Sequence, residues 1–310
     1  MHVAVYGAGA LGSVYGVRLA TRTNTTVSFV VRKRRVAERT SIVIERVRGN
    51  LREEIASPHR TDVIAGDVDL ILLTVATDKL EETRSVLEQS DAPIVVLTPM
   101  MPQDYARMRE AFGDRVLAGM PTVVAYAREN VIRYWQPPEP TRIDEPRAGD
   151  RAAVVRALVR SLEEAGIPTH LEMAVHEINP ATTVCFIPIG MLVAIAGSLE
   201  RLARDPVLVD LAARACREGA ELAPRLGHPM GLATFAPLLA HTLPLRATAA
   251  VLGRLSPEAL TYVDVHFGRK LLTQHAAMAR TMSDLARLKS TPHVALDELR
   301  DRLAAVNVDD

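Results

Sequence analysis

The first twelve residues contain the feature that most restricts the fold. Met1 to Tyr6 form a short apolar run that predicts a β-strand, and Gly7-Ala8-Gly9-Ala10-Leu11-Gly12 follows it directly. An amphipathic run from Ser13 to Ala20 comes next and predicts a helix. Glycines at the first, third and sixth places of this motif allow a tight turn, a close approach of an anion to the backbone, and close packing of helix on strand. The segment therefore predicts a dinucleotide-binding loop whose pyrophosphate contacts are made at the helix N-terminus by Gly7, Gly9, Ala10, Leu11 and Gly12.

The end of the second predicted strand indicates which dinucleotide is bound. Thr26 to Val31 are apolar and rich in β-formers, and Arg32-Lys33-Arg34-Arg35 follow them. An NAD-selective site has a carboxylate here that accepts a hydrogen bond from the ribose 2′-hydroxyl, whereas a guanidinium binds the 2′-phosphate of NADP. These cations would also suit a solvated turn, but beside the glycine loop they favour NADP as the cofactor, held by Arg32 and Lys33.

The composition restricts the partners. The chain has 310 residues with 37 basic and 37 acidic side chains, so its formal net charge is zero. Such a chain has no net field that attracts nucleic acid or an anionic membrane, and we expect a small-molecule substrate instead. The two cysteines, Cys185 and Cys216, have no spacing typical of a disulfide framework or a metal site, and we expect no metal.

The apolar segments indicate a cytoplasmic protein. The N-terminus begins in a strand and has no basic and apolar pattern typical of a secretory signal. The most apolar later run, Val184 to Ala196, contains Pro188 and is shorter than the roughly 20 residues that span a bilayer. We expect it to be a buried helix.

Strand-like and helical patterns alternate along the first half of the chain. Apolar runs at Val3–Tyr6, Val27–Val31, Leu70–Val75 and Ile94–Thr98 are separated by helical patterns, which favours a doubly wound parallel sheet. Ligands of such sheets bind beyond the carboxyl ends of the strands, so we expect Thr74 and Thr98 near the nicotinamide. Later strands are expected within 116–127 and 130–135.

The second half of the chain has mostly helical patterns. Asp150 to Ala165 predict a helix that Gly166 ends, and Thr169 to Leu171 predict one more strand. The remaining predicted elements are helices at about 180–198, 206–226, 232–252, 257–288 and 294–305. The expected fold is α/β, with a doubly wound Rossmann domain over 1–172 and a smaller all-helical substrate and dimerisation domain over 173–310.

This order of motifs resembles the ketopantoate reductase family. The resemblance rests on the Gly-Ala-Gly-Ala-Leu-Gly loop, on Arg32 at the end of the second strand, and on an all-helical second domain beginning near residue 170. It implies an NADPH-dependent enzyme that reduces a 2-keto acid to a 2-hydroxy acid in the cleft between the domains. We expect a homodimer formed through the helical domain.

The positions that the family uses for catalysis differ in this chain. Alanine stands at position 76, where the family has a lysine, and Thr98-Pro99-Met100-Met101-Pro102 replace an asparagine-glycine loop. The family's catalytic lysine aligns with Pro180, and its helical glutamate aligns with Tyr262 or Leu272. Asn179-Pro180 also predicts a helix start. The substrate is therefore expected to be a carbonyl compound other than ketopantoate.

Candidate substrate contacts come from both domains. On a single 257–288 helix, Tyr262, His266 and Arg269 would share one face, where the first two can donate a proton and the arginine can bind a carboxylate. These three are also compatible with an ordinary surface face. His176 and Glu177 lie near the expected cleft, but sequence neighbours do not face each other on a helix and predict no dyad. The expected walls of the groove are Met100, Met101, Asn179 and Thr183.

Two functions remain open at this stage. The first is an NADP-dependent oxidoreductase with a relocated proton donor. The alternative is a protein without redox chemistry that binds or cyclises an apolar metabolite in the cleft, with NADP structural or lost. The intact glycine loop with Arg32 favours the oxidoreductase.

Overall fold

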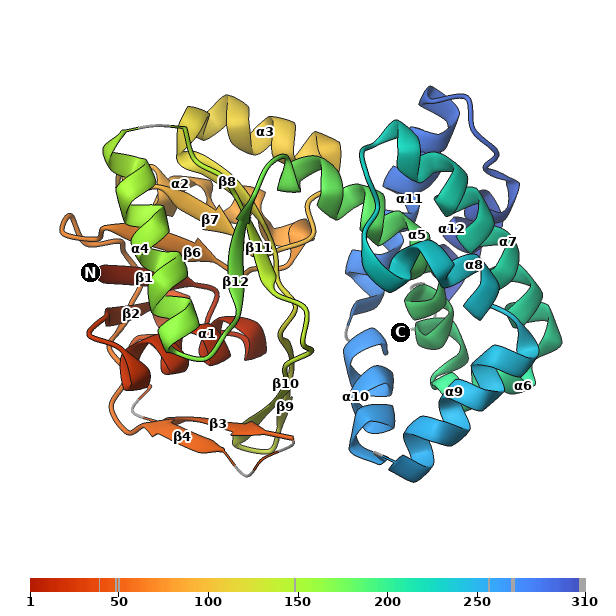
Figure 1. Ribbon diagram of the computed structural model, residues 1–310, viewed down its shortest axis with the longest axis horizontal. Coiled ribbons are helices and arrows are strands. Elements are labelled where there is room, and N and C mark those ends of the chain that lie inside the picture. Colours follow the sequence, from red (N-terminus) through yellow and green to blue (C-terminus); the bar gives the residue numbers. More distant parts are fainter. Residues whose placement is uncertain are drawn as a thin grey trace. The chain divides into compact units, whose positions relative to one another are not determined.

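The computed structural model describes the chain from Met1 to Val306 in two compact units, Met1–His176 and Glu177–Asp310 (Figure 1). It leaves out Arg39, Arg48, Asn50, Ala148, Ser256, Arg269, Lys270 and 307–310. The side chains left out in addition are those of Leu232, Leu252, Leu255, Pro257, Ala259, Tyr262 and His266.

The first unit is built on an eight-stranded sheet. Its strands are β1 (His2–Tyr6), β2 (Thr26–Val30), β5 (Arg60–Thr61), β6 (Leu70–Leu73), β7 (Ile94–Val96), β8 (Val116–Met120), β11 (Thr141–Asp144) and β12 (Thr169–Glu172). They lie in the order β12-β11-β8-β7-β6-β1-β2-β5. The six neighbouring strands β8, β7, β6, β1, β2 and β5 are mutually parallel. Strand β11 pairs antiparallel with β8, and β12 pairs parallel with β11.

Helices cover both faces of this sheet. On one face, α1 (Ala10–Arg22) and α4 (Asp150–Glu164) pack against Val3 and Val5 of β1. On the other face, α2 (Arg84–Leu87) and α3 (Pro102–Phe112) pack in a cluster with Ala4. Alternate residues of β1 thus enter different cores, as the pleat of a strand requires. The predicted doubly wound Rossmann domain followed by a helical region is confirmed.

A second sheet of four strands has the order β4-β3-β10-β9. It consists of β3 (Ile42–Arg46), β4 (Arg52–Ile55), β9 (Val124–Arg128) and β10 (Val131–Trp135). Glu53 of β4 ties the sheet to α1, because its carboxylate accepts from Arg18 at 2.9 Å and also from Arg22. Burial raises the pKa of Glu53, but the two guanidinium hydrogen bonds outweigh burial and leave that pKa below its ordinary value.

Short 3-10 turns link several elements of the first unit. They are η1 (Lys33–Arg35), η2 (Thr77–Lys79), η3 (Glu81–Thr83) and η4 (Gly113–Arg115). The first follows β2, and the second and third lie between β6 and α2. Two of these turns therefore follow carboxyl ends of parallel strands, where ligands of doubly wound sheets bind.

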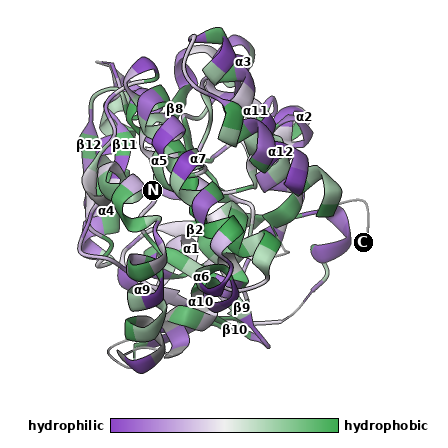
Figure 2. Ribbon diagram, turned by 90° about the vertical axis from the view of Figure 1, so that its right-hand side faces the viewer, coloured by the Kyte–Doolittle hydropathy of each residue, from purple (hydrophilic) through white to green (hydrophobic). Residues whose placement is uncertain are grey.

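The second unit is helical. Its elements are α5 (Val175–Ala196), which begins in the first unit, then α6 (Leu199–Arg204), α7 (Pro206–Leu222), η5 (Ala223–Arg225), η6 (Gly231–Phe235), α8 (Ala236–Leu239), α9 (Thr242–Leu255), α10 (Pro257–Phe267), α11 (Leu272–Leu288) and α12 (Val294–Val306). By length and composition α5 could cross a membrane, but 83% of its most apolar window is buried within the protein. Such burial is typical of a core helix. Figure 2 shows green, hydrophobic segments along the ribbon in the region of α6 and α9.

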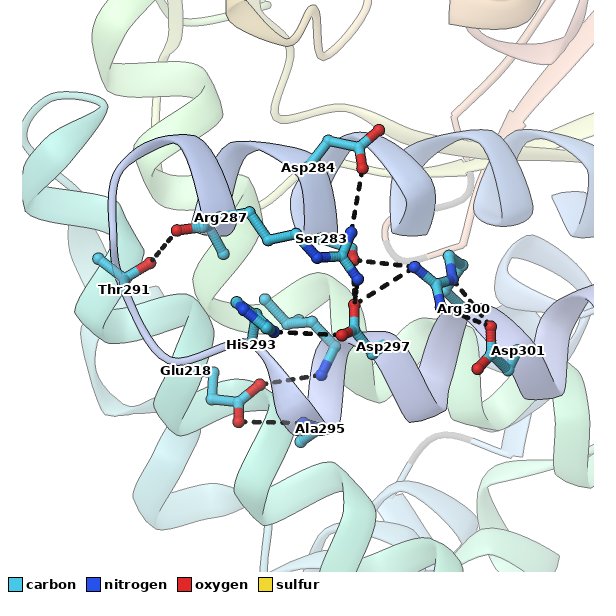
Figure 3. Close-up of polar contacts among 12 residues, drawn as sticks. Glu218, Ser283, Asp284, Arg287, Thr291, His293, Ala295, Asp297, Arg300 and Asp301 are labelled. Carbon is cyan, nitrogen blue, oxygen red and sulfur yellow. Dashed lines mark hydrogen bonds and ion pairs between the residues drawn. The ribbon is translucent and has the colours of Figure 1, made fainter.

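A polar network fixes the last helix (Figure 3). Asp297 of α12 accepts from Ser283 and from Arg287 at 2.6 Å, both on α11, and lies 3.1 Å from the ring of His293. Burial raises the pKa of Asp297, but the hydrogen bond from Ser283 and the charge of Arg287 outweigh burial and lower it. The carboxylate of Glu218 on α7 accepts from two backbone amides at the start of α12. Helix α12 is thereby held to both α7 and α11.

Two predicted helices are interrupted. The expected 257–288 helix is wrong, since α10 ends at Phe267 and α11 begins at Leu272. Gly268 follows α10 directly, and glycine has low helix propensity. The expected 232–252 helix divides between α8 and α9, where Pro244 lies in the first turn of α9, a position that tolerates proline better than a helix interior does.

The predicted start of a helix at Asn179-Pro180 is also wrong. Helix α5 begins at Val175, and Pro180 lies inside it. Ala174, in a left-handed conformation with φ of 58°, turns the chain just before the helix. The carboxylate of Asp144 accepts from the backbone N–H of His176 at 3.4 Å and so serves the first turn. Asp144 belongs to β11, 32 residues earlier in the chain, so no local sequence signal reports this contact.

Candidate functional site

The glycine loop lies between β1 and α1. Gly7 has φ of +106°, a conformation that side chains of L-residues rarely adopt. A Cβ at Gly7 would also lie 2.9 Å from the backbone of Thr74. Gly9 precedes α1 as its N-cap, and its N–H donates to the carbonyl of Gly7 at 2.7 Å. The loop is therefore a tight turn whose shape requires glycine.

Gly12 allows α1 to approach the ends of two strands. A Cβ at this position would lie 2.3 Å from the carbonyl oxygen of Gly7 and 2.4 Å from the hydroxyl of Thr74. That hydroxyl donates to the same carbonyl at 2.7 Å. Thr74, which was predicted near the cofactor, thus fastens the end of β6 to the glycine loop.

The space beside Gly9 is open. A Cβ built at Gly9 would have no described heavy atom within 4 Å, in contrast to Gly7 and Gly12. The first turn of α1 carries no acidic residue, and no side chain caps it. Amides of the first helical turn have no intrahelical acceptor and favour an anion. The loop, with Ala10 and Leu11 at the helix start, therefore fits the pyrophosphate of a dinucleotide.

Charged side chains gather beyond the ends of β2 and β6. Arg32 is 66% exposed and lies 4.0 Å from the carboxylate of Glu82, which also pairs with Lys79 at 2.9 Å. The hydrogen bond from Lys79 lowers the pKa of Glu82, and the same bond raises the pKa of Lys79. Lys33 is exposed in η1. The predicted phosphate-binding cations are accessible, but a carboxylate that the sequence analysis missed lies beside one of them.

The loop after β7 is largely buried. The hydroxyl of Thr98 donates to the carbonyl of Val75 at 2.6 Å, so it joins the ends of neighbouring strands. Met100 is 3% exposed and packs in the core cluster around α3, and Met101 is 2% exposed. Asp104 accepts from the backbone N–H of Met101 at 3.1 Å and caps α3. The described structure therefore gives both methionines a packing role.

A histidine, a carboxylate and a tyrosine meet at the start of α5. The ring of His176 lies 3.3 Å, through Nδ1, from the carboxylate of Asp144, and it stacks on the ring of Tyr105 with centroids 4.6 Å apart. The backbone N–H of Ala118 also donates to Asp144, at 3.0 Å. Sequence reasoning missed this group, because Asp144 and His176 are 32 residues apart and belong to no known motif.

The remaining predicted residues lie on helices of the second unit. Asn179 and Thr183 are buried on α5, where the hydroxyl of Thr183 donates to the side chain of Asn179 at 3.3 Å. Tyr262 and His266 are on α10, and their side chains lie outside the described residues. Arg269 lies outside them entirely, after the end of α10. Within the described part of the chain, no group of three or more potential ligands is placed to hold a metal.

Substitution of the second and third glycines of the motif should affect stability differently. Gly12→Ala should lower the melting temperature by several degrees, because its methyl group would overlap the Gly7 carbonyl and such overpacking costs roughly 1–3 kcal/mol. Gly9→Ala should leave it within about two degrees, since its methyl group enters open space. Differential scanning calorimetry of both variants measures the difference. Equal melting temperatures would contradict the close packing at Gly12.

Comparisons with known proteins agree with this geometry. The family model described as ketopantoate reductase PanE/ApbA matches residues 3–147. A search of curated proteins found no match. A PanE/ApbA family ketopantoate reductase from Ralstonia eutropha JMP134 has a TM-score of 0.75 at 17% identity, over 100% of this chain and 99% of that chain.

Two further solved structures have similar folds. A dimeric ketopantoate reductase from Staphylococcus aureus has a TM-score of 0.69 at 15% identity, over 98% of each chain. D-mandelate dehydrogenase, in a ternary structure with NADH and anilino(oxo)acetate, has a TM-score of 0.72 at 15% identity, also over 98% of each chain. At these identities the likeness concerns the fold. The resemblance to the ketopantoate reductase family is therefore confirmed: the first unit carries the PanE/ApbA match, and the chain as a whole has the ketopantoate reductase fold.

Proposed function

We propose that the protein is an NADPH-dependent oxidoreductase that reduces the carbonyl group of a small 2-keto acid other than ketopantoate. The observation that carries this proposal is the contrast within the glycine loop. Gly12 is closed tightly against Gly7 and Thr74, while the space at Gly9 is open before the uncapped start of α1. Open space before an uncapped helix start is what a bound pyrophosphate needs.

The residues of the first unit have separable roles toward the cofactor. The amides of the glycine loop and of Ala10 and Leu11 would hold the pyrophosphate. Arg32 and Lys33 would pair with the 2′-phosphate. A bound nicotinamide would supply the hydride. Thr74 and Thr98 would shape the site by fixing the strand ends that lie beneath it.

A 2-keto acid substrate agrees with the ligand of one similar protein and with the polar side chains of this chain. One structural relative is a D-mandelate dehydrogenase bound to anilino(oxo)acetate, which contains a carbonyl next to a carboxylate. We assign Arg269 to the substrate carboxylate and the Tyr262 and His266 pair to polar contacts. Met100, Met101, Asn179 and Thr183 are each at most 4% exposed, so we assign none of them to direct contact with the substrate. Ala76 and Pro180 replace lysines of the family, which argues against ketopantoate.

The experiment that tests the function measures NADPH binding and turnover together. We expect NADPH to bind the unmutated protein and to bind Gly9→Ala at least tenfold more weakly, because the added methyl group fills the anion space. Phenylglyoxylate and aliphatic 2-keto acids are then offered with NADPH and absorbance is followed at 340 nm. At least one should turn over at about 1–1,000 per second, and ketopantoate should not.

Three results would contradict the proposal. Failure of NADPH to bind the unmutated protein would remove the cofactor role of the loop. If NADPH binds tightly but none of the 2-keto acids offered oxidises it, the result would favour the alternative function, in which the protein binds a metabolite without redox chemistry. Rapid turnover of ketopantoate would show that the family's lysines are not needed here.

Arg32 is expected to set the preference for NADPH over NADH. A charge-assisted contact with the 2′-phosphate contributes about 1.5–3 kcal/mol, so the preference should be at least tenfold and should shrink in Arg32→Ala. Glu82→Gln should instead strengthen NADPH binding by up to about fivefold, because it removes the carboxylate 4.0 Å from Arg32. Titration calorimetry with both cofactors gives these values. Equal affinities for NADPH and NADH in the unmutated protein would refute this role of Arg32.

We also propose a homodimer formed through the helical unit. Phe235, Leu238, Leu239 and Leu243 are 52%, 66%, 44% and 79% exposed on η6, α8 and α9. Clusters of exposed large apolar side chains are typical of interaction sites, and one relative is a dimeric ketopantoate reductase.

Leu243→Glu should convert a dimer into a monomer of 33.8 kDa, because a carboxylate would be buried in the interface. Light scattering coupled to size-exclusion chromatography measures the mass. Leu288→Glu is the matched control, since Leu288 is 74% exposed at the end of α11. A monomeric unmutated protein, or an unchanged dimer in Leu243→Glu, would exclude this interface.

A further inference from the structure

The group formed by His176, Asp144 and Tyr105 offers acid-base chemistry that none of the roles assigned so far uses. We propose that His176, oriented by Asp144, donates the proton to the substrate oxygen. This inference rests on the proposed reductase function and supplies the donor that Pro180 cannot provide.

Asp144 fixes the orientation of the imidazole. Its side chain is 8% exposed, and its two oxygens lie 3.3 Å and 3.4 Å from Nδ1 of His176. A carboxylate at Nδ1 favours a proton on that nitrogen and stabilises the imidazolium, as carboxylates do for catalytic histidines. The His176 side chain is 34% exposed, so its ring is accessible as well as oriented.

The position of Asp144 in the sheet is set by strand register. Gly119 of β8 pairs with Ile143 of β11, so Ala118 and Asp144 lie next to each other, as their hydrogen bond also shows. Ala118 in turn pairs with Val96, the last residue of β7. Asp144 therefore lies level with the carboxyl end of the parallel strand that leads into Thr98.

The ring of His176 lies beside the loop that follows β7. It stacks on Tyr105 in the first turn of α3, with an interplanar angle of 16°. The preceding residue, Val175, packs in the same core cluster as Met100. In doubly wound sheets this loop lies on the ligand side of the sheet. His176 is thus held at the sheet edge where the reactive end of a dinucleotide is expected.

The charges around the ring are mixed. Burial and the charge of Asp144 raise the pKa of Tyr105, which favours the neutral phenol. Arg109 of α3, Asp114 of η4 and Arg147 after β11 also act on this tyrosine. Glu172 at the end of β12 pairs in register with Asp144, and Glu177 follows His176 on α5.

The proposed step balances with NADPH as the reductant. The substrate carbonyl carbon accepts a hydride from the reduced nicotinamide, and the carbonyl π electrons move to oxygen. That oxygen takes the proton of the His176 imidazolium. The products are the 2-hydroxy acid, NADP⁺ and a neutral imidazole, which solvent reprotonates.

Binding of oxamate tests this assignment without turnover. Oxamate is a 2-keto acid analogue whose amide carbonyl is not reduced, and it is titrated into the protein with bound NADPH between pH 5.5 and 8.5. We expect affinity to fall as pH rises through the range in which histidine titrates, because only the imidazolium donates to the carbonyl. His176→Gln should bind about tenfold more weakly at pH 6 and show no such dependence. Asp144→Asn should weaken binding less.

Matched measurements separate the possible outcomes. His170→Gln is the control, since the ring of His170 on β12 contacts the carbonyl of Thr169 and should not affect oxamate. NADPH affinity reports folding of the first unit in every variant. If NADPH does not bind the unmutated protein, the proposed function and this inference are overturned together. If NADPH binds and keto acids turn over, an unchanged pH profile in His176→Gln would overturn the inference alone. Failure of oxamate to bind at any pH would also overturn the inference alone. The same holds if His266→Gln, and not His176→Gln, removes the pH dependence.

Discussion

The close contact between Gly12 and the carbonyl of Gly7 is the constraint on which the first unit depends. A helix can come this near to two strand ends only where it has no side chain. A Cβ at Gly12 would lie 2.3 Å from the carbonyl oxygen of Gly7, well inside van der Waals contact. The contact brings the start of α1 against the hydroxyl of Thr74, which donates to the Gly7 carbonyl. The tight turn of the loop and the packing of α1 on the sheet both depend on this contact.

The sequence predicts those parts of the fold whose signals are local. The glycine motif, the apolar strands and the helix that Gly166 ends are each specified within a few residues, and the structure has them. Strands β3 and β4 were missed because their apolar patterns are weak: β4 reads Arg-Glu-Glu-Ile, and β3 has a run of only three apolar residues, Ile42 to Ile44. They are stabilised by a buried ion pair between Glu53 and Arg18 of α1, which are 35 residues apart. No local pattern reports a contact of that kind.

The same distinction applies to the candidate site. The glycine turn and the exposed basic residues after β2 could be predicted, since their signals are contained in neighbouring residues, and their role toward a cofactor stays a prediction. The carboxylate of Glu82 beside Arg32 could not, because it comes from a turn 50 residues later. The shared face of Tyr262, His266 and Arg269 assumed one helix over 257–288, but α10 ends at Phe267 and α11 begins at Leu272. Arg269 lies outside the described residues, so its predicted role stays a prediction.

Asp144 joins the start of α5 to the imidazole of His176. The first N–H groups of a helix have no intrahelical acceptor, and Asp144 accepts from the backbone N–H of His176 while it also contacts the ring. Pro180 has no N–H and donates nothing to the carbonyl of His176 four residues earlier, so the first turn of α5 has fewer helical hydrogen bonds of its own. One buried carboxylate thus fixes both the helix start and the ring.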